Sequence, residues 1–182
     1  RSIQSGNVVL DLLRPMEYET YLLFSYSGNT LISVLFNLVP TMVLVYLVTE
    51  GGFALSWNLL WFAGAVFLGT ILNFYINFFV GTICFYTESI WGVNIMKEVI
   101  VLLLSGASIP LAFFPDALRE VVYCLPFHGI YNTPLTLLID NTLSNAQRGE
   151  MLLVQIFWLV VMGILSQVFL RISLRQITVN GG

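Results

Sequence analysis

The sequence predicts an all-α membrane protein, with four transmembrane helices in this part of the chain. Apolar residues make up 58% of the sequence and charged residues only 9%, against roughly 25% charged residues in an ordinary soluble domain. Three long stretches contain no Asp, Glu, Lys or Arg, namely residues 20–49, 51–87 and 151–170. Because an ionised side chain near the bilayer centre costs several kcal/mol, such stretches are typical of helices that face lipid.

Four apolar segments are long enough to cross a bilayer, which requires about 20 residues in a helix. They are residues 28–48, 57–85, 90–109 and 151–170. Backbone amides in lipid must be satisfied within their own segment, and no repeated alternation typical of a β-barrel is visible, so we expect helices. Residues 1–182 would then form a single transmembrane domain. Because the chain begins at Arg1 rather than Met, we expect that further spans precede it.

The distribution of arginines predicts the orientation of these spans. Four arginines flank the spans on one side: Arg1, Arg14, Arg171 and Arg175. Cytoplasmic ends of spans are enriched in basic residues, so we place both ends of the chain in the cytoplasm of a multi-pass protein. Arg119 and Arg148 argue against this orientation, because they lie in the long loop that it places outside.

The N-terminal segment, residues 1–19, contains a short amphipathic pattern. Val8, Val9, Leu12 and Leu13 recur at helical spacing, and Pro15 ends the pattern, since the residue before a proline disfavours the helical conformation. The pattern fits either an interfacial lead-in to the first span or a cytoplasmic helix that docks on a partner.

Residues 112–140 predict a helical hairpin that re-enters the outer leaflet. Asp116 follows a proline and can cap a helix, in which Leu118, Val121, Val122 and Leu125 share one face before Pro126. Residues 127–139 are apolar but too short to span, and segments of that length are typically re-entrant or interfacial. Beyond the hairpin, Ser144 and Gln147 have the spacing of a capping box for the last helix.

Polar residues form one stripe along the second predicted span, at Thr70, Asn73, Asn77 and Gly81. Asparagine facing lipid is costly, so this stripe is expected to face protein or water. Two interpretations remain open: hydrogen bonds between helices, or the lining of a translocation path. Ala65 and Gly69 also form a small-residue pair that permits close helix approach.

The third predicted span contains two charged residues and ends in a segment that is expected to disrupt the helix. Lys97 and Glu98 lie near its cytoplasmic end, where they either extend towards the interface or make a charged contact at a subunit boundary or gate. Ser105 and Ser108, with Gly106 between them, precede Pro110 and are expected to loosen the helix before the hairpin. Thr70, Asn73, Asn77, Lys97, Ser105 and Ser108 are therefore the candidate residues of a path or helix interface.

Several function classes find little support. The net charge is −3, with no basic block to bind nucleic acid. The chain contains no G-x-x-x-x-G-K-[ST] phosphate loop and no H-E-x-x-H motif, and a single His excludes a metal site built from several histidines. Ser108 and His128 are the only loose candidates for a hydrolase pair. We therefore expect no enzyme activity and no cofactor bound by this chain.

The order of motifs resembles the permease subunits of ABC-2 type exporters of bacteria. The segment 6–15 (GNVVLDLLRP) resembles the coupling loop of that family, and 104–115 (LSGASIPLAFFP) resembles the end of its fifth span. Leu125-Pro126-Phe127 and the later Pro134 resemble the re-entrant hairpin of that family. The ending Val179-Asn180-Gly181-Gly182 is similar to the Gly-Gly ending of one subfamily of bacterial ABC-2 permeases. The resemblance extends from Gly6 to nearly the end of the chain, and it implies two further spans before Arg1.

This resemblance implies a permease in a bacterial cell membrane that pairs with an identical or homologous second permease. Separate ATPase subunits would bind ATP and Mg and drive export. The residues implied in coupling to them are Val8, Leu10, Asp11, Leu12, Leu13 and Arg14. The alternatives are a membrane scaffold or assembly protein that does not transport, and a membrane enzyme.

Overall fold

The computed structural model describes residues 24, 26, 28–30, 32, 33, 36, 39, 40, 43, 58–83 and 90–180, without the side chains of 90 and 174–180. The chain divides into two compact units, Arg1–Phe53 and Ala54–Gly182. In the first unit every described residue is helical, and the Ser33 hydroxyl donates to the Asn29 carbonyl oxygen at 2.9 Å. The predicted segment 1–19 lies outside the described residues, and the predicted span 28–48 is described only in part.

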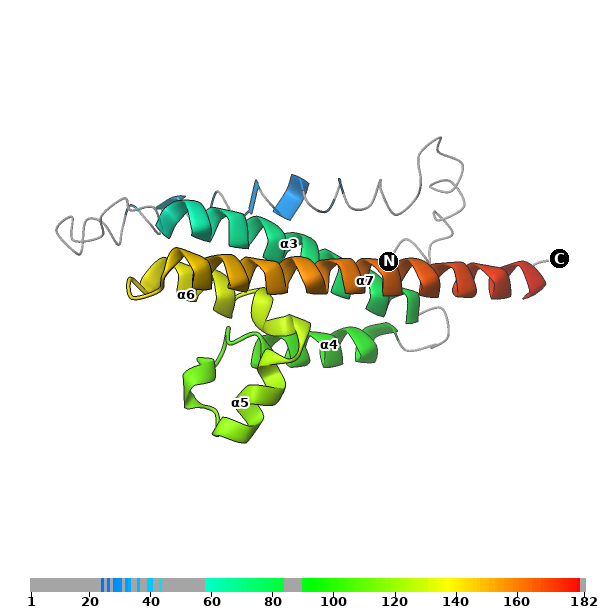
Figure 1. Cartoon of the computed structure of the whole chain (residues 1–182). Coiled ribbons are helices and arrows are strands. Elements are labelled where there is room, and N and C mark those ends of the chain that lie inside the picture. Colours follow the sequence, from blue (N-terminus) through cyan, green and yellow to red (C-terminus); the bar gives the residue numbers. More distant parts are fainter. Residues whose placement is uncertain are drawn as a thin grey trace. The chain divides into compact units, whose positions relative to one another are not determined.

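The second unit contains five α-helices and two short 3-10 helices in its described residues, and no strand (Figure 1). They are α3 (Asn58–Ile83), α4 (Ile90–Leu104), η1 (Leu111–Phe113), α5 (Asp116–Tyr123), η2 (Pro126–Gly129), α6 (Asn132–Ile139) and α7 (Asn145–Asn180). Among the described residues, α3 and α7 are long and apolar enough to cross a membrane. The predicted all-helical fold is thus confirmed for the described residues, whereas the number of spans, the coupling helix and the re-entrant placement of the hairpin stay predictions.

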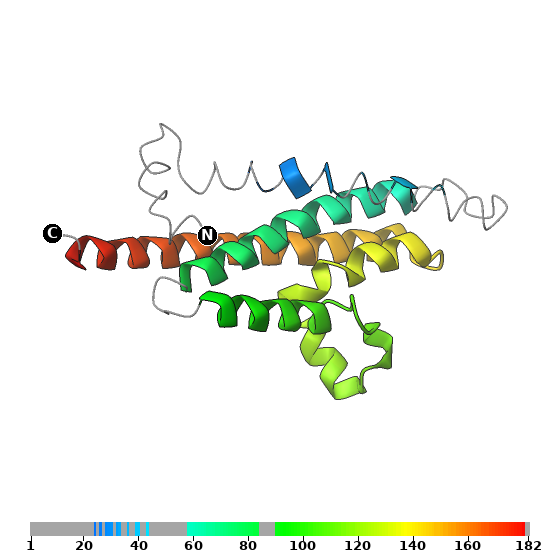
Figure 2. The ribbon, with the colours of Figure 1, turned by 180° about the vertical axis from the view of Figure 1, so that it is seen from behind.

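Helices α3 and α7 lie side by side and run in the same direction (Figures 1 and 2). The Gln155 side chain donates to the Ala65 carbonyl oxygen, and the Ser166 hydroxyl donates to that of Tyr75. The two partners are 90 residues apart in the first contact and 91 in the second. A constant separation along both helices is possible only if the helices are parallel.

The hydrophobic core of this unit lies where α3, α7 and the segment between α4 and α7 meet. Its buried centre consists of Leu72, Ile76, Ile130 and Met162. Tyr75, Phe79, Val101, Phe127 and Trp158 pack around this centre. Each fully buried aliphatic side chain stabilises such a core by about 1.5–3 kcal/mol in water. The core therefore joins residues from four helical elements that are far apart in the sequence.

Helix α4 ends five residues before the predicted limit of 109. The Ser105 backbone N–H still bonds the Val101 carbonyl oxygen at 3.0 Å, but Gly106 has φ +81°. This left-handed conformation stops a helix, and glycine adopts it without a Cβ penalty. A Cβ at Gly106 would also lie 3.3 Å from Leu111 Cγ. The serine–glycine signal was thus recognised in the sequence, but its position as a helix end was not.

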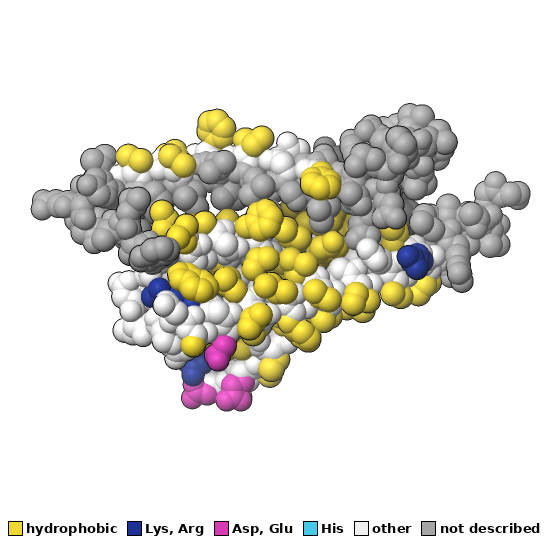
Figure 3. Space-filling view, turned by 45° about the horizontal axis from the view of Figure 1, so that its top comes forward, with side chains coloured by type: hydrophobic (Ala, Val, Ile, Leu, Met, Phe, Trp, Pro, Cys, Tyr) yellow, Lys and Arg dark blue, Asp and Glu magenta, His cyan; other side chains and the backbone are white. Residues whose placement is uncertain are grey.

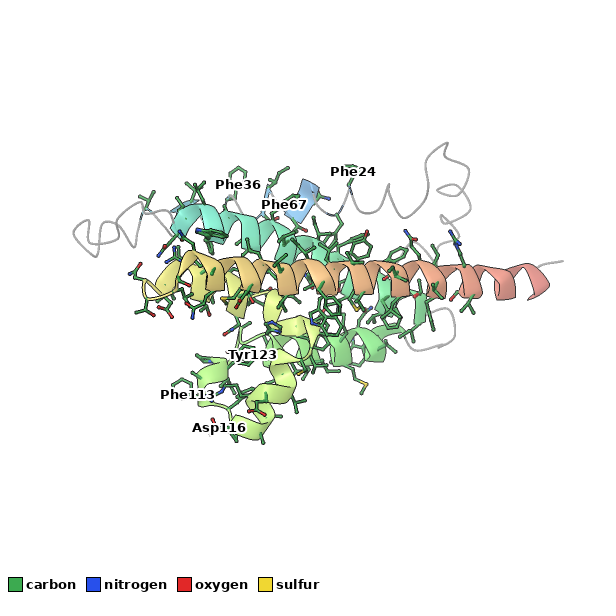
Figure 4. The ribbon with its side chains drawn as sticks, in the orientation of Figure 1. Phe24, Phe36, Phe67, Phe113, Asp116 and Tyr123 are labelled. Atoms are coloured by element: carbon green, nitrogen blue, oxygen red, sulfur yellow. The ribbon has the colours of Figure 1, made fainter. Side chains whose placement is uncertain are left out.

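The predicted helix after Pro115 exists as α5, but its predicted cap is wrong. Pro115 is the N-cap residue and makes no side-chain capping bond. Asp116 lies in the first turn and instead pairs with Arg119, with 2.6 Å between Oδ1 and Nη2. Because α5 packs mainly on η2, only Val122 of the predicted apolar face is fully buried, while Leu118 and Val121 are exposed. Figure 4 shows the exposed Phe113 beside this helix.

The start of α7 agrees with the predicted capping box. The Ser144 N–H donates to Gln147 Oε1 at 2.9 Å, and the Gln147 N–H donates to Ser144 Oγ at 3.3 Å. The helix then continues for 36 residues, so the predicted span 151–170 lies entirely within it.

Pro134 does not interrupt α6, because it occupies the first turn, where no intrahelical N–H bond is required.

Candidate functional site

The segment from η1 to α6, residues 111–139 and here called the hairpin segment, is locked between α3 and α7. Gln155 Nε2 donates to the Gly129 carbonyl oxygen at 2.6 Å and to that of Ala65 at 3.2 Å. A Cβ added to Gly69 would lie 3.1 Å from the backbone oxygens of Gly129 and Ile130. This contact is tighter than ordinary van der Waals packing, so a larger residue at position 69 would push the two backbones apart. The predicted small-residue pair on α3 therefore accommodates the hairpin segment.

The hairpin segment reaches far along α3. Asn58, the first residue of α3, donates through Nδ2 to Asn141 Oδ1 at 2.7 Å, just after α6. Gly69, which meets η2, is about 16 Å further along the helix axis at ~1.5 Å per residue. Helix α6 packs on α3 along most of this distance. The C-terminal end of the hairpin segment thus lies near the start of α3, and η2, in its interior, lies near the middle of α3.

The polar stripe of α3 is used in two different ways. The Thr70 hydroxyl is buried and donates to the Val66 carbonyl oxygen at 2.8 Å, within its own helix. One and two turns further on, Asn73 and Asn77 are half-buried, and Asn77 Nδ2 donates to Asn73 Oδ1 at 3.4 Å. Lys97 Nζ donates to Asn77 Oδ1 at 2.6 Å. A polar contact therefore joins α3 to α4.

A cavity of about 540 Å³ lies at this contact; we call it the α3–α4 groove. Its polar wall carries Asn73, Asn77 and Lys97, and Tyr131 closes on it from the hairpin segment. The remaining lining residues are Ile95, Glu98, Val99, Val101 and Leu102. The groove thus combines an apolar surface with one cation, two amides, a phenol and a carboxylate. Pockets for small molecules typically combine a mainly apolar lining with a few polar groups.

The two serines of the predicted site lie elsewhere. Ser105 is fully buried, and its carbonyl oxygen accepts from the Asn132 N–H at 3.1 Å, which ties the end of α4 to the start of α6. Its hydroxyl oxygen is one of three buried side-chain polar atoms that have no hydrogen-bond partner in the described part of the chain. Ser108 is exposed. Of the six predicted residues, the structure brings three together in the α3–α4 groove, and their role stays a prediction.

His128 does not pair with Ser108. Its Nδ1 lies 2.7 Å from the Leu125 carbonyl oxygen, which can only accept, so Nδ1 carries the proton. The ring packs edge-on against Tyr123 at 5.4 Å between centroids. Burial lowers the pKa of His128 below its usual value. A dyad needs a nucleophile within hydrogen-bond reach of the base, and no hydrogen bond joins these two described residues.

Other titratable groups lie at the polar turn before α7. Asp140 accepts from both the backbone N–H and the hydroxyl of Thr142, at 2.8 and 2.6 Å. These bonds favour the carboxylate and lower the pKa of Asp140. In the described ranges, no group of three or more His, Cys, Asp and Glu side chains could hold a metal ion.

Sequence reasoning missed the residues that fix the hairpin segment. Gln155 is fully buried and bonded to two chain segments, and Tyr131 lines the α3–α4 groove. A signal for Gln155 existed, since polar residues inside an apolar run are expensive and usually face protein. No local pattern distinguished Tyr131 or Gly129, because their importance comes from contacts with distant parts of the chain.

The apolar surface of the second unit identifies the class of protein. In the apolar window of α7 only 17% of the residues are buried, against 39% in α3. Figure 3 shows hydrophobic side chains spread over one face, with the acidic side chains gathered at one corner. Water disfavours so large an apolar surface, whereas lipid accepts it. The two long apolar helices are thus typical of a helical membrane protein.

The family follows from comparison with known proteins. The model of the family described as ABC-2 family transporter protein matches residues 1–181. The chain therefore belongs to the ABC-2 transporter family, which confirms the resemblance noted in its motifs, and it is a membrane component of such a transporter. No curated protein and no solved structure matches the chain.

Proposed function

We propose that this chain is the permease subunit of an ATP-driven exporter, with ATP hydrolysed by separate ATPase subunits. The observation that carries the proposal is the family match across residues 1–181. The chain contains no phosphate-binding loop of its own. In this proposal ATP and Mg are bound by the partner subunits, and the permease lies in a bacterial cell membrane.

The direction of the helices supports the proposed topology. Because α3 and α7 are parallel, the chain must return across the membrane between them, and α4 lies in the required position. Two parallel outward-to-inward helices agree with four spans and two cytoplasmic ends. Arg119, one of the two arginines that argue against this orientation, is paired with Asp116. The reach of the hairpin segment to Gly69 supports its placement as a re-entrant element of the outer leaflet.

We assign coupling to the N-terminal residues Val8, Leu10, Asp11, Leu12, Leu13 and Arg14, which lie outside the described part of the chain. A second permease would cover α4. This helix exposes apolar residues around its circumference, with Trp91 78% and Met96 68% exposed. Asn73, Asn77 and Lys97 would then belong to the substrate path, because they line the α3–α4 groove. Thr70, Ser105 and Ser108 would hold helices and loops together.

Co-purification tests the assignment of subunits. The full-length protein is extracted from bacterial membranes in mild detergent, and its partners are identified by mass spectrometry. An ATPase subunit in stoichiometric amount is expected. A complex that contains no ATPase in any extraction condition would favour a scaffold over an exporter.

Substitution of two leucines tests the coupling segment. Leu12→Asp and Leu13→Asp are expected to reduce ATPase recovery at least tenfold, because each places a charge in an apolar contact. Val9→Asp, on the same short segment, measures the effect of a general loss of helix amphipathicity. Membrane insertion is followed in parallel by carbonate extraction. If ATPase recovery is unchanged in both leucine variants, the coupling assignment is wrong.

A further inference from the structure

We propose that the α3–α4 groove binds an amphiphile with an anionic head group, the head on Lys97 and the alkyl part along the apolar wall. The proposal has two parts: the groove binds such an amphiphile, and this amphiphile belongs to the class of transported substrates. Only the second part rests on the proposed transport function. Binding itself needs no ATP and no partner subunit, so it can be measured separately.

The cation in the groove has no anionic partner in the described residues. Lys97 Nζ donates to Asn77 Oδ1, and the only described ion pair is that of Asp116 with Arg119. An ammonium group has three N–H donors, and an amide oxygen accepts a bond without neutralising the charge. Lys97 lies seven residues after the start of α4, about 10 Å along the helix axis. A cation at that depth in an apolar helix is costly unless an anion accompanies it.

The Lys97 ammonium is held on the inner wall rather than at the mouth of the groove. Its bond to Asn77 directs it towards α3, and Asn73 extends the same polar wall by one turn. Tyr131 faces the groove from the hairpin segment, and its hydroxyl can donate to a head-group oxygen. Oxygen-rich anions such as phosphate or carboxylate suit this set of donors.

The apolar part of the groove lining suits an alkyl chain. Val99 and Leu102 are 48% and 49% exposed, and both line the cavity beside Lys97. Because α4 is proposed to cross the membrane, the gain for an alkyl chain on this surface is close packing rather than removal from water. The volume of about 540 Å³ lies within the range of small-molecule pockets, roughly 300–1,000 Å³. A free inorganic anion would leave this wall uncovered.

Glu98 also lines the groove and decides the sign of the preferred ligand. Consecutive helical residues point about 100° apart, and Glu98 is exposed whereas Lys97 is half-buried on α3. A cationic ligand would have to bind the exposed carboxylate and would meet the Lys97 ammonium behind it. An anionic ligand meets the Lys97 ammonium as its counter-charge, and the exposed Glu98 carboxylate only weakens the binding of that ligand.

Binding of matched amphiphiles tests the proposal. The full-length protein, with any subunits that co-purify, is placed in nanodiscs of phosphatidylcholine. Radiolabelled dodecyl phosphate is the probe, dodecyl phosphocholine is its zwitterionic counterpart, and inorganic phosphate is the free anion. Saturable binding is expected for dodecyl phosphate alone. Equal competition by inorganic phosphate would contradict the amphiphile, and equal binding of the zwitterion would contradict the charge requirement.

Four variants locate the site. Lys97→Gln keeps a hydrogen-bond donor but loses the charge, so dodecyl phosphate should bind about tenfold more weakly or worse. Lys97→Arg should bind within about threefold of wild type, because the charge remains. Glu98→Gln should bind more tightly, because repulsion is removed, and Leu102→Trp should bind more weakly, because it fills the groove.

Each outcome has a clear meaning. If Lys97→Gln is monodisperse and binds like wild type, the proposal is overturned. If that variant does not fold, the exposed positions decide: unchanged affinity in both Glu98→Gln and Leu102→Trp overturns it equally. Absence of ATPase subunits in the preparation would remove the exporter assignment while leaving the binding result valid.

Discussion

Gln155 Nε2 lies 2.6 Å from the carbonyl oxygen of Gly129 and donates a hydrogen bond to it. This bond joins the first third of α7 to the end of η2, while the second bond of the same amide reaches Ala65 on α3. A single side chain therefore holds three segments together. Leu72 packs against Gly129 from α3 and shields the contact, since a Cβ on that glycine would lie 3.1 Å from Leu72 Cδ2.

Replacing Gln155 should release the hairpin segment. Gln155→Met keeps the length of the side chain but leaves the Gly129 carbonyl without this donor, so the protein should lose about 1–2 kcal/mol of stability. Gln167→Met is the matched control, because Gln167 is an exposed glutamine on the same helix. Thermal unfolding of the purified protein in detergent measures both. Equal melting temperatures of the two variants would show that the hydrogen bonds of the Gln155 amide do not contribute to stability.

Two glycines of α3 should respond to alanine in opposite ways. Gly69→Ala places a Cβ 3.1 Å from two backbone oxygens, and such overpacking costs about 1–3 kcal/mol. Gly64→Ala meets nothing within 4 Å, so its higher helix propensity should be neutral or stabilising by up to ~1 kcal/mol. Chemical denaturation of the two variants tests the difference, and a stability of Gly69→Ala at or above that of Gly64→Ala would contradict the close packing.

His128 should make the stability of the hairpin segment pH-dependent. Its pKa in the folded protein is lowered by burial, so the folded state favours the neutral ring. The stabilisation is complete above the unfolded pKa, 6.5, and is lost as the pH falls through that value towards the lower folded pKa. Melting temperatures between about pH 8 and pH 5 should therefore decline on acidification.

The Asn substitution at this position isolates the effect of the imidazole. His128→Asn retains a donor near the Leu125 carbonyl oxygen but does not titrate, so its pH profile should be flatter than that of wild type. Asp140 does not confuse the comparison, because its pKa is lowered and it titrates in a more acidic range. Parallel profiles of wild type and variant would show that His128 is not the group responsible.

The capping box at the start of α7 should behave as one unit. Ser144→Ala removes a bond to the Gln147 N–H and should cost about 1 kcal/mol. Gln147→Ala removes the reciprocal bond to the Ser144 N–H. Because each bond supports the other, the double variant should lose less than the sum of the two single losses. A double-mutant cycle by thermal unfolding checks this, and strict additivity would mean that the two bonds act independently.

Features that depend on neighbouring residues could be predicted from the sequence. The capping box of α7 needed only Ser144 and Gln147 at the right spacing, and the charge-free runs located α3 and α7. Asp116 shows the limit of such reasoning. Its carboxylate could accept from backbone N–H groups at the start of α5 or pair with Arg119, and it pairs with Arg119. The end of α4 depended on one residue, Gly106, taking a left-handed conformation.

The candidate site could be predicted only in its parts. Asn73 and Asn77 share a helix face by periodicity alone, but the bond from Lys97 to Asn77 depends on how α4 is aligned along α3. That alignment follows from the packing of Val101 and Ile130 in the core, which a single sequence does not encode locally. Gln155 and Gly129 meet for the same reason, so the amide lock became visible only in three dimensions.

The length of α7 has a mechanical consequence. Its 36 residues extend about 54 Å, whereas the hydrocarbon layer of a bilayer is about 30 Å thick, so α7 is much longer than one crossing requires. Because a helix is stiff, movement of the C-terminal part of α7 would be transmitted along the helix to its N-terminal third, where Gln155 holds the hairpin segment. Bending at the C-terminal end of α7 would then displace the turn that precedes Asn145, at the opposite end of the helix.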